Sequence, residues 1–384
     1  MSSRYTPLEM LERLVAFPTV SRDSNLALID FVDDYLAGHG VSAVRSVSPC
    51  GRKANLHASI GPLREGGVVL SGHTDVVPVD GQAWSSDPFV VTARDERLYG
   101  RGTADMKSFL AIALALVPEM AALTRPIHLA LSYDEEVGCL GAPTLIASLL
   151  NTVPRPAAVI VGEPTGMRVV TAHKSIFLFA THVRGFEVHS SLQDDGVSAI
   201  MFAGRMLAWL GERQRQNRLR ALPSAAFAPG YTTVHCGRIE GGTASNITAR
   251  DCYFLTDIRA LPTERAEDHF RAFERFCREE LEPEMQAVEP SCHIRFDVLA
   301  DVPGFAAGVT EPAVLLAQQL TGQNGTEAVS YAAEAGQFSA ARLSVVVCGP
   351  GEIAQAHQPD EYITTAQFAA GIEFQRRLID QLSR

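Results

Sequence analysis

Four short apolar runs, each upstream of a side chain that can bind a metal ion, constrain this chain more than any other feature of its sequence. The runs are Val68–Leu70, Ile127–Leu131, Ala158–Val161 and Ser344–Val347. Each has the length and composition of a buried strand. Because open α/β sheets place their ligand sites at the carboxyl ends of strands, we expect side chains remote in the sequence to meet there.

The potential metal ligands lie in five stretches: Ser71–Asp75, Gly102–Asp105, Asp134–Glu136, Gly162–Thr165 and Ala356–Asp360. Zinc accepts imidazole and carboxylate ligands, and a two-metal site needs a bridging ligand together with terminal ligands on each ion. Two histidines and three carboxylates meet that need, and they are His73, Asp105, Glu136, Glu163 and His357. Two divalent ions with three carboxylates leave one net positive charge, which favours ionisation of a bridging water. The set therefore predicts a two-metal hydrolase.

Glu135 and Glu136 are adjacent at the end of an expected strand. Successive side chains of a strand point in opposite directions. We therefore expect one glutamate to bind metal while the other faces the attacking water.

Composition excludes several classes of protein. A chain of 384 residues is too long for one ordinary core, which suggests two domains. A formal charge of -11 without a basic run argues against a nucleic-acid partner. Seven dispersed cysteines fit reduced thiols in a cytoplasmic enzyme. The sequence shows neither a signal-peptide core nor an apolar run of the roughly 20 residues that would span a bilayer, so we expect no membrane partner.

Strand-like and helix-like segments alternate up to about residue 175, a pattern typical of a largely parallel sheet covered by helices. We expect helices over Pro7–Phe17, Asn25–Ala37 and Met106–Leu123, with Asp105 at the helix start that favours a carboxylate. Helices over Glu311–Leu320 and Thr365–Leu382 resume the pattern near the end of the chain.

A different unit interrupts that pattern. Its expected elements are a strand over Ile176–Val183, a helix over Val197–Gln216, strands over Tyr231–Ile239 and Cys252–Ala260, a helix over Glu264–Leu281 and a strand over His293–Leu299. This order, βαββαβ, is the ferredoxin-like split-βαβ arrangement. We therefore expect an α/β fold in which a mainly parallel-sheet catalytic domain, residues 1–175 and 301–384, contains an inserted lid and dimerisation domain, residues 176–300.

Three long motifs resemble those of a known family. Ser71–Pro78, Tyr99–Lys107 and Asp134–Gly138 are similar to the motifs of the co-catalytic zinc aminoacylase and carboxypeptidase family, whose members include acylamino-acid deacylases, desuccinylases and carboxypeptidases. Gly241–Thr248 and Asp257–Pro262 resemble that family's inserted domain. The resemblance thus extends over essentially the whole chain.

The resemblance implies a role for each ligand. One ion would be held by His73, Asp105 and Glu163, and the other by Asp105, Glu136 and His357, with Asp105 as the bridge. The ions would be zinc, with cobalt as the alternative. Asp75 would orient the His73 imidazole. The peptide bond between Asp105 and Met106 would be cis.

The remaining implied roles concern proton transfer and substrate binding. Glu135 would be the general base. His189 matches a histidine that stabilises the oxyanion from the partner subunit of a homodimer. Asn246 and Arg259 match positions that hold the substrate carboxylate and line the cleft, although Arg259 could instead form an internal ion pair.

The segment Tyr331–Phe338 resembles the branch of the family that deacetylates N2-acetyl-L-ornithine in arginine biosynthesis. Glu334 would then pair with the terminal ammonium of the substrate, because a desolvated ammonium needs a carboxylate partner. A solvated loop glutamate is the alternative for Glu334. The alternatives for the function are a deacylase of acetylcitrulline, succinyl-diaminopimelate or a broad set of acylamino acids, and a catalytically silent metal-binding relative.

Overall fold

The computed structural model describes residues 4–221 and 226–384, and these residues form two compact units. The first unit contains Met1–Ala172, Phe305–Ala328 and Ala333–Arg384, and the second contains His173–Gly304 with the short segment Val329–Ala332. The boundaries fall at residues 172 and 304, where the sequence indicated 175 and 300. The short segment beyond residue 328 was not expected from the sequence.

The first unit is built on a mixed sheet with the strand order β1-β2-β6-β3-β7-β15-β8-β13. Its centre is parallel, since β6, β3, β7 and β15 run in the same direction. The strands are β1 (Ala43–Val47), β2 (Ala54–Ile60), β3 (Val68–His73), β6 (Ile127–Ser132), β7 (Ala158–Val161), β8 (Val170–His173), β13 (Phe305–Ala306), β14 (Glu327–Val329, paired with β8) and β15 (Val345–Val347). All four expected apolar runs are therefore strands of the parallel centre.

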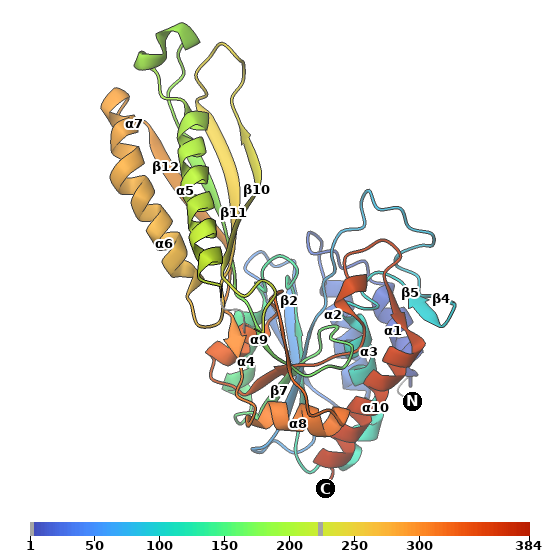
Figure 1. Ribbon diagram of the computed structural model, residues 1–384. Helices are drawn as coiled ribbons and strands as arrows, with labels where there is room; N and C mark the ends of the chain where they lie inside the picture. Colours follow the sequence, from blue (N-terminus) through green and yellow to red (C-terminus); the bar gives the residue numbers. More distant parts are fainter. Residues whose placement is uncertain (1–3, 222–225) are drawn as a thin grey trace. The chain divides into compact units, whose positions relative to one another are not determined.

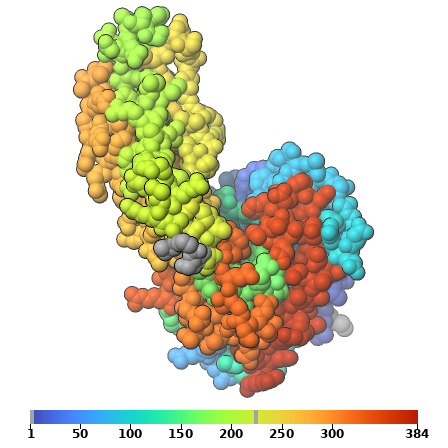
Figure 2. All heavy atoms as spheres, in the orientation of Figure 1, coloured from blue at the N-terminus to red at the C-terminus, as the bar shows by residue number. Residues whose placement is uncertain are grey.

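Helices cover this sheet on both faces, and Figure 1 shows α4 and α9 on one side of it and α1, α3 and α10 on the other. The helices are α1 (Pro7–Val15), α2 (Leu26–Gly38), α3 (Lys107–Ala115), α4 (Ala142–Thr152), α8 (Pro312–Thr321), α9 (Ala335–Ala340) and α10 (Thr365–Leu382). Every residue of α3 is buried. In the space-filling view, orange and red atoms of the segments after residue 305 form much of the visible surface of this unit (Figure 2).

Helix α3 is shorter than the Met106–Leu123 helix that the sequence predicted. It ends at Ala115, and a 3₁₀ helix follows over Val117–Ala122 with Pro118 in its first turn. Proline lacks the amide hydrogen that continues an α-helix, and its ring clashes with the preceding turn. The prediction missed a break that Pro118 itself indicated.

A small sheet of β4 (Thr92–Arg94), β5 (Arg97–Tyr99) and β16 (Tyr362–Thr364) joins two distant parts of the first unit. Tyr362 pairs with Tyr99 in the β16–β5 register. The loop after Tyr99 and the loop before Tyr362 are thereby brought together, and both carry candidate metal ligands.

The second unit has the expected βαββαβ order. Its elements are β9 (Ile176–Arg184), α5 (Ala199–Leu219), β10 (Thr233–Gly241), β11 (Asp251–Arg259), α6 (Ala266–Phe276), α7 (Glu282–Val288) and β12 (His293–Val302). The strands form an antiparallel sheet in the order β10-β11-β9-β12 (Figure 1). The helix predicted over Glu264–Leu281 begins at Ala266 and continues through a π-helical turn, Cys277–Leu281, into α7.

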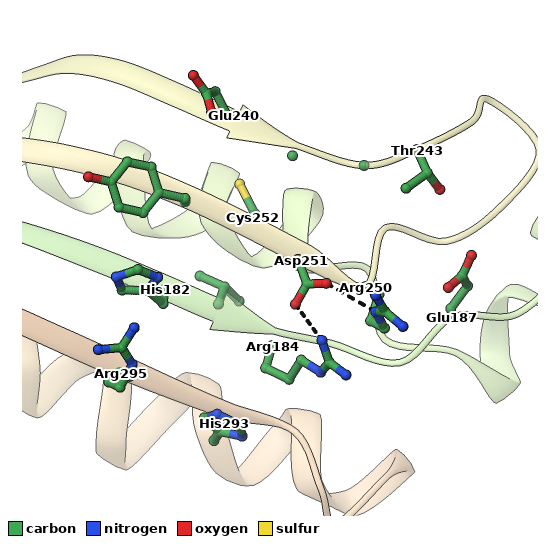
Figure 3. A pocket seen from close by; sticks show the side chains of 14 residues that line it. His182, Arg184, Glu187, Glu240, Thr243, Arg250, Asp251, Cys252, His293 and Arg295 are labelled. Carbon is green, nitrogen blue, oxygen red and sulfur yellow. Dashed lines mark hydrogen bonds and ion pairs between the residues drawn. The ribbon is translucent and has the colours of Figure 1, made fainter.

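Helices cover one face of this antiparallel sheet, where Phe179, Phe254 and Phe273 form a closely packed aromatic core. The other face has a hollow of about 570 Å³ near the ends of β9 and β11 (Figure 3). Arg184 and Arg250 both pair with Asp251 there. Within the described residues, no helix is long and apolar enough to cross a membrane.

Candidate metal centre

The first unit positions all five predicted metal ligands. His73 is the last residue of β3, Glu163 follows the end of β7, and Glu136 lies in the turn after β6. Asp105 directly precedes Met106, the N-cap of α3, and the Asp105–Met106 peptide bond is cis as expected. His357 comes from the loop between β15 and β16. The carboxyl ends of the parallel strands thus bring together residues nearly 300 positions apart.

Asp105 lies between the two histidines, with one carboxylate oxygen toward each. Its Oδ1 is 3.1 Å from His73 Nε2, and its Oδ2 is 3.3 Å from His357 Nε2. Glu163 Oε1 lies 3.9 Å from His73 Nε2, while Glu136 Oε2 lies 3.0 Å from His357 Nε2. Glu163 thus lies near His73 and Glu136 near His357, with Asp105 between the two histidines. His73, Asp105 and Glu136 also offer ligand atoms within 4.8 Å of one another, so the two predicted ligand groups are not sharply separated.

The accessibility of these groups differs. The His73 side chain is 1% exposed, whereas that of His357 is 52% exposed. The cluster is therefore closed at His73 and open to ligands at His357.

Asp75 contacts His73 differently from the expectation. The Asp75 backbone carbonyl lies 2.8 Å from His73 Nδ1, and the side-chain Oδ1 lies 3.7 Å away. The carboxylate instead accepts hydrogen bonds from the backbone amides of Glu135 at 3.1 Å and Glu136 at 3.3 Å. Asp75 therefore holds the turn that carries both glutamates.

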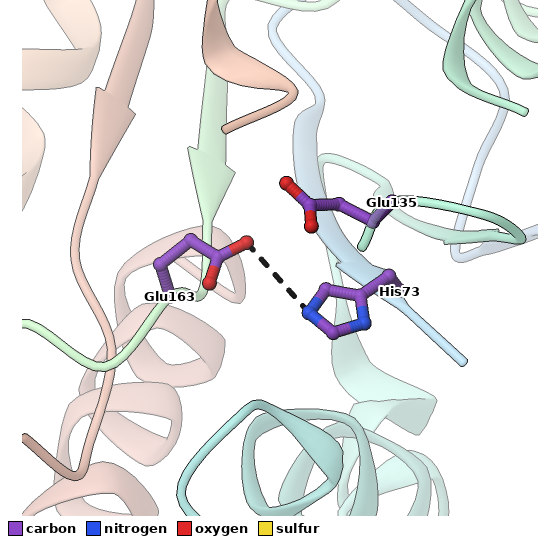
Figure 4. Close-up of side chains that lie close together, drawn as sticks. All are labelled: His73, Glu135 and Glu163. Carbon is purple, nitrogen blue, oxygen red and sulfur yellow. Dashed lines mark ion pairs between the residues drawn. The ribbon is translucent and has the colours of Figure 1, made fainter. Parts of the chain in front are cut away.

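Glu135 and Glu136 point to different parts of the cluster. Glu135 approaches His73 and Glu163 from the turn after β6 (Figure 4), and one ligand atom from each of the three lies within 4.8 Å of the other two. Glu136 reaches His357 instead. A buried neighbour that the sequence did not reveal, Cys139, donates a thiol hydrogen bond to Glu135 Oε1 at 3.3 Å. Glu135 is thus held beside the cluster without being one of the five predicted ligands.

Burial and mutual repulsion change the protonation of the carboxylates. Burial raises the pKa of Glu135 to about 8 and that of Glu136 to about 7, and it raises that of Glu163 well above the ordinary value. Hydrogen bonds to Asp105 and Glu136 raise the pKa of His357 to about 10. Burial would raise the pKa of Asp105 as well, but His357 and His73 hold it well below the usual range. Without a metal ion, protons neutralise this cluster.

The donor set fits two divalent ions. Imidazole and carboxylate are zinc ligands, and a carboxylate with its two oxygens directed to different histidines can bridge two ions. Glu163 Oε1 is buried and has no hydrogen-bond partner among the described residues, so it is free to bind a cation. His73, Asp105 and Glu163 could hold one ion, and Asp105, Glu136 and His357 the other.

Glu334 lies in the interior of the first unit rather than in a solvated loop. Its side chain is buried, and its Oε2 accepts a hydrogen bond from Ser71 Oγ at 3.1 Å. Its Oε1 has no partner among the described residues. Burial raises the pKa of this carboxyl group. Glu334 is therefore a buried carboxyl group with one oxygen that can still accept a hydrogen bond.

Three predicted site residues belong to the second unit. His189 Nδ1 lies 2.8 Å from Ser191 Oγ, and the exposed Asn246 accepts a hydrogen bond at its backbone oxygen from Ser190. Arg259 donates to both carboxylate oxygens of Asp257, at 2.9 and 3.0 Å. This is the internal ion pair that the sequence left open as an alternative for Arg259.

Sequence reasoning missed two positioning contacts besides Cys139. Lys53 forms an ion pair with Asp134, the residue before Glu135. Glu361 accepts hydrogen bonds from three backbone amides of the Asp105 loop. Only proximity to the motifs could have indicated them, because Asp134 and Glu361 each lie within a few residues of a candidate ligand.

Residues 69–381 match the model of peptidase family M20/M25/M40. The chain belongs to this family. Among its relatives named acetylornithine deacetylase, the protein of Yersinia pseudotuberculosis (strain IP 31758) is 36% identical, with 98% of this chain and 96% of that protein aligned. The Myxococcus xanthus protein of the same name is 37% identical, with 92% and 91% aligned.

Solved structures show the same M20 fold. A metallo-carboxypeptidase of the M20 family from Sulfolobus solfataricus superposes with a TM-score of 0.79 at 17% identity, covering 99% of both chains. A tripeptidase from Staphylococcus aureus gives a TM-score of 0.74 at 17% identity and covers both chains completely. A solved M20-family peptidase from Bacillus subtilis, 14% identical, is described as dinuclear metal binding. In this chain the side chains around Asp105 and His73 are candidates for holding metal ions.

Metal affinity should rise with pH. Groups whose pKa is raised in the folded metal-free protein, including Glu136 and His357, hold protons that a metal ion must displace. We expect the affinity for Zn²⁺ to rise about tenfold per pH unit for each displaced proton, up to the pKa of the group that holds it, which is about 7 for Glu136 and about 10 for His357. Competition with a chromophoric chelator measures this slope.

The stability of the metal-free protein should change with pH in the opposite direction to its metal affinity. Glu135, Glu136 and His357 keep protons in the folded metal-free chain at pH values where the unfolded chain has released them, so their contribution to the unfolding temperature should fall as pH rises through their pKa values of about 7 to 10. A metal affinity that does not change with pH would contradict the assigned ligands.

Proposed function

We propose that this protein removes the acetyl group from N2-acetyl-L-ornithine, giving L-ornithine and acetate, a step of arginine biosynthesis. The observation that carries the proposal is the position of Glu135, a carboxylate additional to the five predicted ligands, with an oxygen within 4.8 Å of ligand atoms of His73 and Glu163. The likeness to proteins named acetylornithine deacetylase, at 34–37% identity over 92–98% of the chain, supports the choice of substrate.

The chemistry divides between the ions and the protein. When bound, two divalent ions polarise the acyl carbonyl and lower the pKa of a water molecule. Glu135 takes the proton of the attacking water and then delivers it to the leaving amine nitrogen. Glu135 is adjacent to the predicted ligands His73 and Glu163, where an attacking water would lie. We propose zinc as the metal, with cobalt as the alternative, and a cytoplasmic location.

Replacement of Glu135 should separate chemistry from metal binding. Glu135→Gln keeps the size of the side chain and leaves the five ligands intact, so the protein should bind two metal ions and lose about 10²- to 10⁴-fold in turnover. His73→Ala and His357→Ala should instead each lower the affinity for one ion. Elemental analysis and a steady-state assay with acetylornithine give the two readouts.

Turnover by Glu135→Gln above a tenth of the wild-type value would show that Glu135 is not the base. A wild-type protein that binds two ions but hydrolyses none of a panel of acylamino acids would favour a catalytically silent relative.

Glu334 supports an ammonium-bearing substrate. A buried carboxylate oxygen without a partner is a costly arrangement, and a cationic ligand group would relieve it. Burial raises the pKa of Glu334 in the absence of such a partner, and an adjacent ammonium would lower it. The ornithine side chain of the substrate provides this group.

Glu334→Gln should therefore change selectivity. The kcat/KM for acetylornithine should fall by roughly 100-fold or more, since loss of one partner of a buried charge pair costs several kcal/mol. The value for neutral acetylmethionine should change far less. Glu327→Gln, at an exposed ion pair with Arg168, is the matched control and should leave both values unchanged. Equal losses on both substrates would remove Glu334 from substrate recognition.

We further propose a homodimer formed through the second unit, in which His189 stabilises the oxyanion in the partner's active site while Asn246 and Arg259 bind the substrate. An antiparallel sheet whose outer strands are β10 and β12 can extend across a two-fold axis, and two-fold dimers are the commonest oligomers. Arg259 would have to exchange Asp257 for the substrate carboxylate. The contact would involve α5 and its adjoining strand.

Mixing two inactive proteins tests this arrangement. His189→Ala and Glu135→Gln each remove one component of a composite site, so exchange of subunits should create some dimers with one intact site and restore part of the activity. Activity is measured after exchange has been verified with labelled subunits. Absence of recovery in exchanged dimers would mean that each site is complete within one chain.

A further inference from the structure

The loop that carries Asp105 is held by a buried carboxylate outside the ligand cluster. Glu361 is 1% exposed, and its Oε1 accepts hydrogen bonds from the backbone amides of Gly102, Ala104 and Asp105 at 3.0, 2.9 and 3.1 Å. Its Oε2 lies 2.6 Å from an Arg101 guanidinium nitrogen, and Arg101 is also 1% exposed. One carboxylate thus fixes the backbone on both sides of Thr103 and up to Asp105.

The same ion pair reaches the loop that carries His357. Arg101 donates to Gln82 Oε1 at 2.6 Å, and Gln82 Nε2 donates to the backbone oxygen of His357 at 3.0 Å. Arg101 also contacts the backbone oxygen of Gln358 at 3.4 Å. The Asp105 backbone and the His357 backbone are therefore connected by hydrogen bonds through Glu361, Arg101 and Gln82, none of which is a predicted metal ligand.

The backbone of both loops needs such support. Gly102 and His357 adopt positive φ angles of 87° and 65°. A non-glycine residue such as His357 is rarely found in this region and persists there only where surrounding contacts determine it. The carbonyl oxygen of His357, fixed by Gln82, is such a contact.

A charged carboxylate is also better suited than a neutral group to this environment. Three amide hydrogens and a guanidinium converge on Glu361, and hydrogen bonds to a charged acceptor are about twice as strong as neutral ones. Ligands of a metal ion must be held close to the binding geometry before the ion arrives, which is the work of residues behind them.

We infer that Glu361 is a positioning residue for the metal centre, which sets Asp105 through the amides of its loop and His357 through Arg101 and Gln82. The inference rests on the two-metal site proposed above. Because Asp105 belongs to both ligand groups, disturbing Glu361 should weaken both ions. Gln82 hydrogen-bonds Trp84, Arg101 and the backbone of His357, and His357 is the one predicted ligand among these partners, so disturbing Gln82 should weaken one ion.

Zinc affinity of the metal-free full-length protein provides the test, with competition against a chromophoric chelator resolving the two ions. Glu361→Gln should weaken both ions by about 10- to 100-fold, the usual effect of removing a partner behind a metal ligand. Gln82→Ala should weaken one ion by about tenfold and leave the other within a factor of two. The matched control is Glu352→Gln, which breaks another Arg–Glu pair, with Arg168, in the segment before His357.

Glu352→Gln should bind both ions as wild type does. Thermal unfolding of each metal-free variant gives the stability change separately. Wild-type affinity for both ions in Glu361→Gln and Gln82→Ala, with only the unfolding temperature lowered, would overturn the inference. If Glu361→Gln does not fold, Gln82→Ala decides alone, and two unchanged affinities overturn it. A wild-type protein that binds no zinc would instead contradict the proposed function.

Discussion

The structure of the first unit depends on one carboxylate that faces two histidines. Asp105 directs its oxygens to His73, at the end of β3, and to His357, in a loop nearly 300 residues further along the chain. For that contact to exist, β3 and β15 must end, and α3 must begin, at the same edge of the sheet. A largely parallel sheet satisfies this condition, because all its carboxyl ends point to one side.

Charge is the second constraint on this edge. Buried carboxylates raise one another's pKa values, and without cations they hold protons or share them with the histidines. The fold therefore creates a concentration of negative potential that divalent ions can relieve. Asp75, Lys53 and Glu361 hold the backbone segments that carry the carboxylates, and Cys139 donates to the Glu135 carboxylate itself.

Much of this could be predicted from the sequence. The apolar runs gave the central strands because their period and length are those of buried strands, and the βαββαβ order of the second unit followed from alternating periods. His73, Glu136 and Glu163 lie at or just after strand ends, as the sequence indicated, whereas the pairing of β16 with β5 that joins the Asp105 and His357 loops was not expected. Helix ends were less predictable, as the break at Pro118 and the π turn after Phe276 show.

Contacts made by side chains across the fold were not predictable. Asp75 meets His73 through its carbonyl oxygen and the glutamate turn through its carboxylate, and no spacing rule distinguishes the two. Glu361 lies four residues after a candidate ligand but faces a loop more than 250 residues away. Hydrogen-bond partners of this kind depend on tertiary structure and cannot be inferred from spacing in a single sequence.

The zinc stoichiometry of Asp105→Ala tests whether Asp105 is shared by two metal ions. Wild type should bind two ions per chain, His73→Ala and His357→Ala should each weaken one, and Asp105→Ala should lose both. An Asp105→Ala protein that folds and retains one ion with wild-type affinity would contradict a shared bridging carboxylate.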